Sequence, residues 1–258
     1  MAGEHISDKG GIGRDRTGEH RVGERMAAAR FYPSVQGAVV ARLVRARLGA
    51  IWPDAAGCRV LGLGYAAPYL RLWRETATSC VAACPLPTPF RWPPTGPGQS
   101  CAVEEEALPF PDLCFDRVLL MHGLELAANA RRLLREVWRV LGDDGRLIVV
   151  APNRRGVWAH VEGTPFGQGQ PYSPGQIERL LTSALFHVEH RDTALYVPPT
   201  TSRLVLRGAE LWEAAGRRLA PRYAGVTITE AVKDAFAAMP LPAQNRTVLR
   251  KLVMSPES

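Results

Sequence analysis

Short apolar segments alternate with helix-like segments along this chain, and this alternation constrains the fold more than any other feature. Four of the apolar segments are typical of buried parallel strands, because they are short and apolar and are bounded by turn residues. A strand-helix-strand order at this spacing predicts an α/β protein whose mostly parallel sheet carries helices on both faces. The four expected strands are Cys58–Gly64, Ser79–Ala83, Phe115–Met121 and Arg146–Ala151.

Apolar residues at spacings of three and four predict the helices. One helix is expected from residue 35 to about Gly49, a short one over 67–75, and one over 127–141 that a Gly142–Gly145 turn separates from the next strand. Between residues 85 and 98 lie six prolines, so this stretch is expected to be neither a helix nor a central strand.

The last third of the chain also alternates. Ser173 and Pro174 suit the N-cap and first turn of a helix whose buried stripe is expected to include Leu180 and Leu185. Strands are expected near 186–191 and 225–230. A helix over 203–219 is expected to lie between them, with its leucines facing inward; these are Leu204, Leu211 and Leu219.

Composition indicates a globular protein, since 46% of the 258 residues are hydrophobic and 22% are charged. The sequence predicts a flexible leader over 1–25, a domain over 26–235 and a basic tail over 236–258. No window approaches the roughly 18 apolar residues of a membrane span, so we expect no membrane association. The charged first residues favour a cytoplasmic location over secretion.

The net charge of +7 is weak evidence for a nucleic-acid partner. Of the 32 Lys and Arg residues, three are lysines, at positions 9, 233 and 251, so 29 are arginines, a bias more typical of base composition than of a ligand. The five cysteines contain no Cys-x-x-Cys pair. We therefore expect reduced cysteines and no metal site.

Two segments resemble the type 11 group of class I S-adenosylmethionine-dependent methyltransferases. Residues 107–118, ALPFPDLCFDRV, are similar to that group's A-x-x-L-P-F-x-D-x-x-F-D-x-V motif, and residues 133–147 are similar to its following helix and strand. The resemblance implies a doubly wound, seven-stranded, Rossmann-like methyltransferase fold over about residues 30–235. It also implies S-adenosylmethionine as the cofactor and a methyl acceptor as the substrate.

The cofactor motifs depart from the group's pattern. In the first loop, Gly64 matches a family glycine, Gly62 stands where the family has an acid, and Ala66 and Pro68 replace two further glycines. After the second expected strand the chain has Ala-Cys-Pro, without the acid that would hold the ribose. A charge-assisted hydrogen bond is worth about 1.5–3 kcal/mol, so losing two would weaken cofactor binding by roughly a hundredfold or more.

The resemblance nevertheless implies a cofactor site at the carboxyl ends of the first and fourth strands. Glu104 and Glu105 stand where the family has an acid that reaches the adenine amino group, although a solvated acidic turn explains them equally well. The expected cofactor-binding residues are Gly62, Gly64, Tyr65, Glu104, Glu105 and Met121.

His122 follows the fourth expected strand, where the crevice of such a fold opens, so it is a candidate general base for the acceptor. A histidine satisfied by the backbone of a loop is the structural alternative. Two later loops reach the same edge of the sheet and supply candidate acceptor-binding residues: Arg154, Arg155, Gln168 and Tyr172. Turn chemistry and helix capping explain the other residues of these loops equally well.

Three functions remain open from the sequence. The first is a methyltransferase of unidentified acceptor, and the second is a methyltransferase-like protein without turnover that acts as a binding or scaffolding subunit of a protein partner. A nucleotide-dependent oxidoreductase is disfavoured, because the Gly62-Leu63-Gly64 stretch lacks both a third glycine and an acid about twenty residues later.

Overall fold

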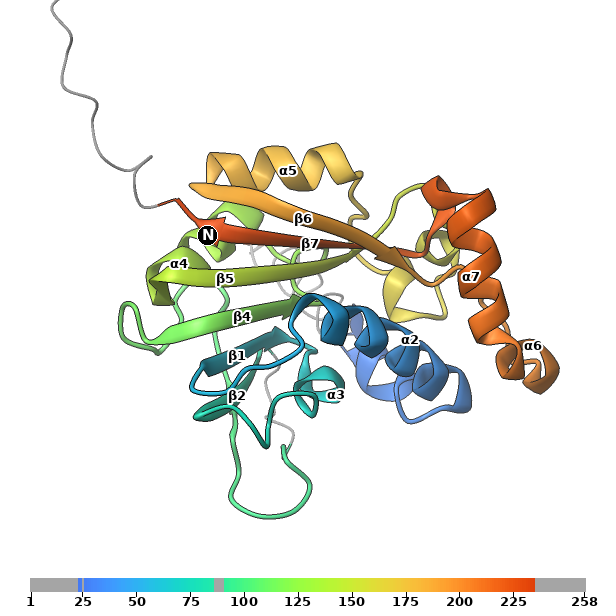
Figure 1. The fold of residues 1–258 in the computed structure, drawn as a ribbon. Helices are drawn as coiled ribbons and strands as arrows, with labels where there is room; N and C mark the ends of the chain where they lie inside the picture. The colour runs from blue at the N-terminus through green and yellow to red at the C-terminus, as the bar shows by residue number, and fades with distance from the viewer. Residues whose placement is uncertain (1–22, 25, 86–90, 235–258) are drawn as a thin grey trace, which may run out of the picture.

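The protein forms a seven-stranded sheet with helices on both faces (Figure 1), as the alternating pattern predicts. The computed structural model describes residues 23–24, 26–85 and 91–234. The expected tail over 236–258, and all of the expected leader except residues 23 and 24, lie outside the described residues. The strand order is β3-β2-β1-β4-β5-β7-β6.

The first five strands run parallel to one another. Strand β7 pairs antiparallel with both β5 and β6 and completes the sheet. The strand order reverses between β1 and β4, because the chain continues from β1 to one side of this pair and from β4 to the other side. Such a switch point opens a crevice at the carboxyl ends of the strands. The strands are β1 (Arg59–Gly64), β2 (Ser79–Cys84), β3 (Ser100–Ala102), β4 (Phe115–Met121), β5 (Leu141–Pro152), β6 (Phe186–Ala194) and β7 (Val226–Lys233).

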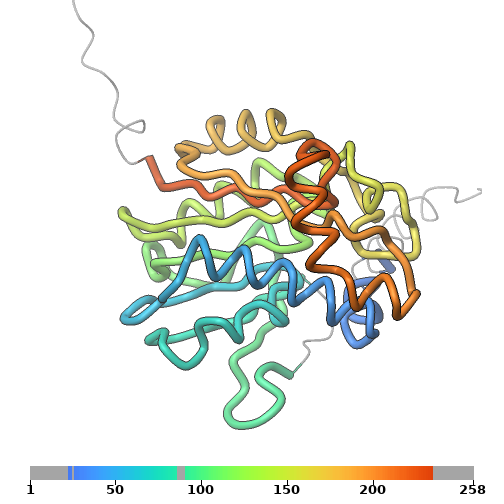
Figure 2. Tube along the Cα trace, turned by 45° about the vertical axis from the view of Figure 1, so that its right-hand side comes forward, coloured from blue at the N-terminus to red at the C-terminus, as the bar shows by residue number. Residues whose placement is uncertain are grey.

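Each face of the sheet has its own core. Helix α2 (Val35–Ile51) and the short helix α3 (Ala67–Leu70) pack on one face, and α2 crosses in front of the strands in Figure 2. Helices α4 (Ala130–Val140) and α5 (Pro174–Ser183) cover the other face. Successive residues of a strand point to opposite faces, so strands covered on both sides are apolar throughout.

Local signals explain where the helices begin. The Asn129 side chain accepts a hydrogen bond from Arg132 N, so α4 starts at residue 130 and not at 127 as the apolar spacing predicts. Ser173 and Gln176 form a capping box at the start of α5, with Pro174 in its first turn, as predicted. Leu185 lies beyond the end of α5 at a positive φ and is 36% exposed, so its predicted place in the buried stripe is wrong.

The predicted helix over 203–219 is two helices, α6 (Arg203–Arg207) and α7 (Ala209–Leu219), which meet at Gly208. Its predicted inward leucines face solvent instead, since Leu204, Leu211 and Leu219 are 76–80% exposed. The buried contacts come from Leu206, Ala209 and the carboxylate of Glu213, which accepts hydrogen bonds from Leu195 N and Tyr196 N. A buried acid satisfied by the backbone therefore orients α7, and leucine spacing does not.

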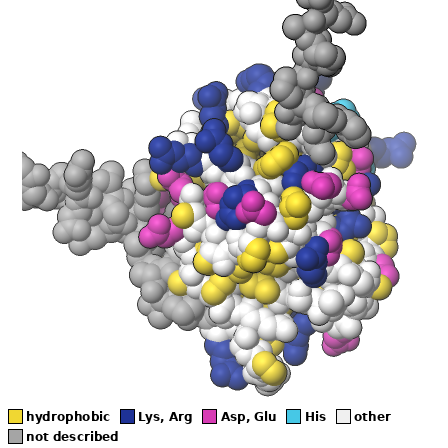
Figure 3. All heavy atoms as spheres, turned by 90° about the vertical axis from the view of Figure 1, so that its left-hand side faces the viewer, with side chains coloured by type: hydrophobic (Ala, Val, Ile, Leu, Met, Phe, Trp, Pro, Cys, Tyr) yellow, Lys and Arg dark blue, Asp and Glu magenta, His cyan; other side chains and the backbone are white. Residues whose placement is uncertain are grey.

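The expected turn over Gly142–Gly145 is part of β5, where the pairing with β4 shifts between Phe115 and Arg117. One face of the molecule carries cationic, anionic and apolar side chains in alternation, without a continuous basic patch (Figure 3). Within the described residues no helix has the length and hydropathy needed to span a membrane.

Candidate functional site

The turn that leaves β1 lies against the end of β4. Gly64 has φ +82°, and a Cβ placed there would lie 2.2 Å from the Met121 carbonyl oxygen. Tyr65 N donates to that same oxygen at 2.7 Å. Only glycine adopts this φ readily and also lets the backbone approach so closely. The turn at the crevice therefore requires glycine at position 64.

The residue two positions earlier faces a different environment. A Cβ on Gly62 would lie 2.6 Å from a Leu70 methyl group and 2.8 Å from the Ala66 Cβ. The space that a carboxylate would need at this position is therefore filled by α3. The end of β2 is equally apolar, because Cys84 is buried and Pro85 follows it.

The acidic pair before β4 is divided between two roles. Glu105 is 7% exposed, and its Oε1 accepts a hydrogen bond of 2.8 Å from Ala128 N, so it joins the segment after β3 to the loop before α4. Glu104 is exposed and pairs through its backbone with Ala107. Of the two predicted adenine contacts, Glu104 alone has a side chain open to solvent.

His122 is buried at the end of β4, and both of its ring nitrogens have partners. Nδ1 lies 3.0 Å from Glu125 Oε1, and Nε2 lies 2.8 Å from the Tyr32 hydroxyl, which is itself 2.7 Å from the hydroxyl of Tyr69. His122 is therefore held by a series of hydrogen-bonded side chains, and not by backbone groups of a loop as in the structural alternative. The second carboxylate oxygen of Glu125 is buried without a partner among the described residues.

The direction of these hydrogen bonds follows from their chemistry. When Glu125 is ionised and the ring is neutral, His122 Nδ1 donates to Glu125 and Nε2 accepts from Tyr32. Tyr32 has then used its hydrogen and accepts from Tyr69. Burial raises the pKa of both tyrosines, which keeps both hydroxyls protonated near neutral pH.

Aromatic rings close the space around His122. Tyr32 stacks on Tyr65 with ring centroids 5.4 Å apart and an interplanar angle of 10°. Phe166 packs against the His122 ring at 4.8 Å and against Phe31 at 6.0 Å. These partners were missed by sequence analysis; the available signals were the Phe31-Tyr32 pair before the α2 N-cap and an acid three residues after His122.

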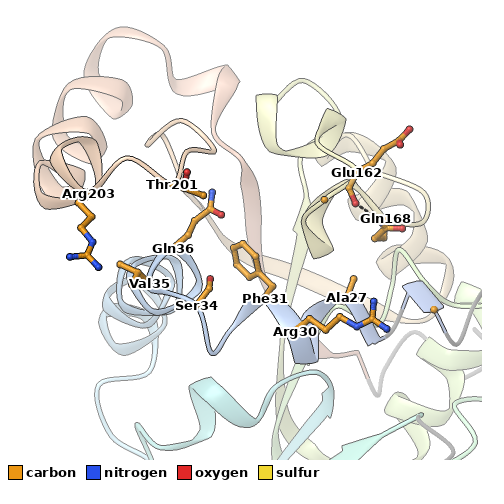
Figure 4. A pocket seen from close by; sticks show the side chains of 12 residues that line it. Ala27, Arg30, Phe31, Ser34, Val35, Gln36, Glu162, Gln168, Thr201 and Arg203 are labelled. Atoms are coloured by element: carbon orange, nitrogen blue, oxygen red, sulfur yellow. Dashed lines mark hydrogen bonds between the residues drawn. The ribbon is translucent and has the colours of Figure 1, made fainter.

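Phe31 of this cluster also lines a cavity of about 640 Å³, which we call the polar cavity because polar and charged side chains surround Phe31 there (Figure 4). Gln168, one of the predicted acceptor-binding residues, lines this cavity and donates to the Glu162 carbonyl oxygen. The remaining polar lining comes from other segments: Arg30, Ser34, Gln36, Glu162, Thr201 and Arg203.

The other predicted acceptor residues lie elsewhere. Arg154 and Arg155 are exposed after β5, and none of the ion pairs among the described residues includes them. Tyr172 is half-buried and pairs through its backbone with the loop after β5. Asn153 anchors that loop, because its side-chain amide donates to the Arg222 and Ala224 carbonyl oxygens.

None of the five cysteines forms a disulfide, and the described residues contain no cluster of three or more metal-ligating side chains. Burial raises the pKa of the Cys80 thiol to about 12, which leaves it protonated and unreactive. The Cys80 side chain therefore serves as a small apolar group of β2.

Residues 50–149 match the family model described as a methyltransferase domain. The chain is 30% identical to an uncharacterized protein of Mycobacterium tuberculosis over 111 residues, which cover 40% of this chain and 39% of that protein. It is 31% identical to the demethylmenaquinone methyltransferase of Thermus thermophilus over 125 residues, or 48% of this chain and 50% of that enzyme. The chain thus spans half or less of the length of these relatives.

The fold agrees with solved structures over a longer stretch. A SAM-dependent methyltransferase of Thermotoga maritima superposes with a TM-score of 0.54 at 15% identity, covering 83% of this chain and 99% of that one. At this identity the likeness concerns the fold. It extends the agreement beyond residues 50–149 to most of the described chain.

Proposed function

We propose that this chain binds S-adenosylmethionine and transfers its methyl group to a polar acceptor, since residues 50–149 match a family model described as a methyltransferase domain. The observation that carries the proposal is the turn at Gly64 and Tyr65, which packs on the Met121 carbonyl at the switch point between β1 and β4. Ligands of open α/β sheets bind at this position.

The backbone of the crevice fits the cofactor better than its side chains do. Gly64 allows close approach, Tyr65 offers a ring face, and Glu104 is open to an adenine amino group. The positions of the two family acids are apolar, at Gly62 and at the end of β2. We therefore expect binding to be weaker by about two orders of magnitude than in a protein with both acids.

When bound, S-adenosylmethionine supplies an activated methyl group, so the protein has mainly to position an acceptor and accept its proton. His122 is the proposed base, because the contact of its Nδ1 with Glu125 orients the ring and favours the tautomer whose Nε2 can accept a proton. In the described conformation Tyr32 occupies Nε2. An acceptor therefore replaces the Tyr32 hydroxyl, which requires the turn between residue 31 and α2 to move outward.

The acceptor is proposed to enter from the polar cavity, whose lining includes Gln168 and both positively and negatively charged side chains. This lining suits an uncharged or zwitterionic polar group more than an apolar chain. Arg154 and Arg155 stay predicted contacts for a negative group of the acceptor. A cytoplasmic location and a protein partner also stay predictions.

Isothermal titration of the full chain with S-adenosylmethionine and S-adenosylhomocysteine tests the proposal. We expect measurable binding of both, and Glu104→Gln should weaken it several-fold by removing one charged acceptor. Glu75→Gln is the matched control, because Glu75 is an exposed acid distant in sequence from the acidic pair. Absence of binding at millimolar ligand would reject the enzyme and favour the alternative of a binding or scaffolding subunit.

A further inference from the structure

A second cavity of about 640 Å³ lies between α2 and the segment that follows β1. Three arginines line it: Arg45 from α2, and Arg71 and Arg74 from the turns after α3. Its volume falls within the roughly 300–1,000 Å³ of small-molecule sites. We call it the arginine cavity.

No carboxylate of the described residues pairs with the positive charge of this cavity. Across residues 26–85 and 91–234, no carboxylate forms an ion pair with Arg45, Arg71 or Arg74. Arg45 Nη1 donates to the Pro68 carbonyl oxygen at 3.1 Å, which leaves the other guanidinium donors for a ligand. Burial and the nearby charge of Arg71 lower the pKa of Arg45, so an anion placed here would relieve an existing repulsion.

Aromatic side chains complete the walls. Trp92 is 7% exposed and Tyr65 is half-buried, and both line the cavity together with Tyr32. Flat aromatic walls favour a ligand with an apolar or aromatic body, while the guanidiniums favour an anionic group. S-adenosylmethionine matches this combination less well than an anionic ligand does, because its sulfonium and ammonium groups give it a net positive charge despite its carboxylate.

We propose that the arginine cavity binds a phosphate monoester with an aromatic body, the phosphate between Arg71 and Arg74 and the ring against Trp92. A phosphate monoester carries close to two negative charges near neutral pH and three acceptor oxygens. Guanidinium donors match this geometry better than a single ammonium does. The proposal goes beyond methyl transfer and does not depend on it.

Isothermal titration of the full chain in a phosphate-free buffer tests the proposal, with phenyl phosphate, inorganic phosphate and phenol as probes. We expect phenyl phosphate to bind most tightly, inorganic phosphate to bind more weakly and phenol not to bind. The Arg71→Gln/Arg74→Gln double variant should weaken phenyl phosphate binding at least about tenfold. Both arginines are exposed, so this variant should keep the wild-type melting temperature.

The matched control is Arg131→Gln/Arg135→Gln, which removes two exposed arginines from α4 on the opposite face of the sheet. It changes net charge equally and should leave phenyl phosphate affinity unchanged. Equal losses in both double variants would show a general charge effect and overturn the site. Equal affinity for phenyl phosphate and inorganic phosphate would overturn the aromatic part. Because no S-adenosylmethionine is present, failure here is distinct from failure of the methyltransferase proposal.

Discussion

At Gly64 the backbone leaves little choice of side chain. We expect Gly64→Ala to lower the free energy of unfolding by at least about 2 kcal/mol, because the new Cβ meets the Met121 carbonyl at a positive φ. Urea unfolding measures the change. Gly98→Ala is the control, since a Cβ there has no neighbour within 4 Å. Equal stability of the two variants would contradict the strained turn.

Glu104 and Glu105 are adjacent in sequence but should respond differently to substitution. Glu105→Ala should cost about 1–3 kcal/mol, because it leaves the Ala128 N–H without its buried acceptor. Glu104→Ala should leave thermal stability within about 0.5 kcal/mol of wild type, as expected for an exposed acid. Thermal melting of both variants checks this, and a stability loss at Glu104 would count against its role as a ligand contact.

The position of His122 at the end of a strand could be predicted from the sequence, but its partners could not. The apolar residues of the strand indicate where it ends, whereas Tyr32, which contacts His122, lies 90 positions earlier in the sequence. Only the packing of the turn before α2 brings the two rings together. The same holds for the arginine cavity, whose arginines come from α2 and from the turns after α3.

At the scale of elements, β1, β2 and β4 were predictable to within one residue at each end, because burial on both faces makes most of each strand apolar. Strand β5 begins five residues before its predicted start, and the three-residue strand β3 was not predicted. The region of α6 and α7 was not predictable either. Its leucines recur at helical spacing yet face solvent, because the buried Glu213 carboxylate and Ala209 decide which side of α7 faces the sheet.

The exposed face of α7 gives a direct test of this orientation. Leu211→Gln should change the free energy of unfolding by no more than about 0.5 kcal/mol, since its side chain is 76% exposed. Leu206→Ala, on the buried side of α6, should cost about 2–5 kcal/mol by leaving a cavity. Urea unfolding of both variants decides between this orientation and one in which Leu211 is buried.

At the scale of the whole molecule, β1 and β4 are joined at their starts by a charged contact as well as by the ladder. Arg59 donates to both carboxylate oxygens of Asp116, at 3.0 and 2.9 Å, and the Arg59 backbone N–H also donates to Asp116. The side-chain hydrogen bond from Arg59 is the main cause that lowers the pKa of Asp116 in the folded state. Protonation of Asp116 at low pH therefore weakens the contact between β1 and β4 and lowers the stability of the molecule in acid.

Because the folded pKa of Asp116 lies below its unfolded value of about 4, the contact contributes its full stability above that value. The contribution is lost as the pH falls from about 4 through the lower folded pKa. Asp116→Asn should therefore lower the free energy of unfolding at pH 7 and flatten its decline below pH 4, measured by urea unfolding at each pH. Asp144→Asn, at an exposed acid in β5, should keep the wild-type slope. An unchanged acid slope in Asp116→Asn would show that other carboxylates, such as Glu136 beside Arg139, govern acid unfolding.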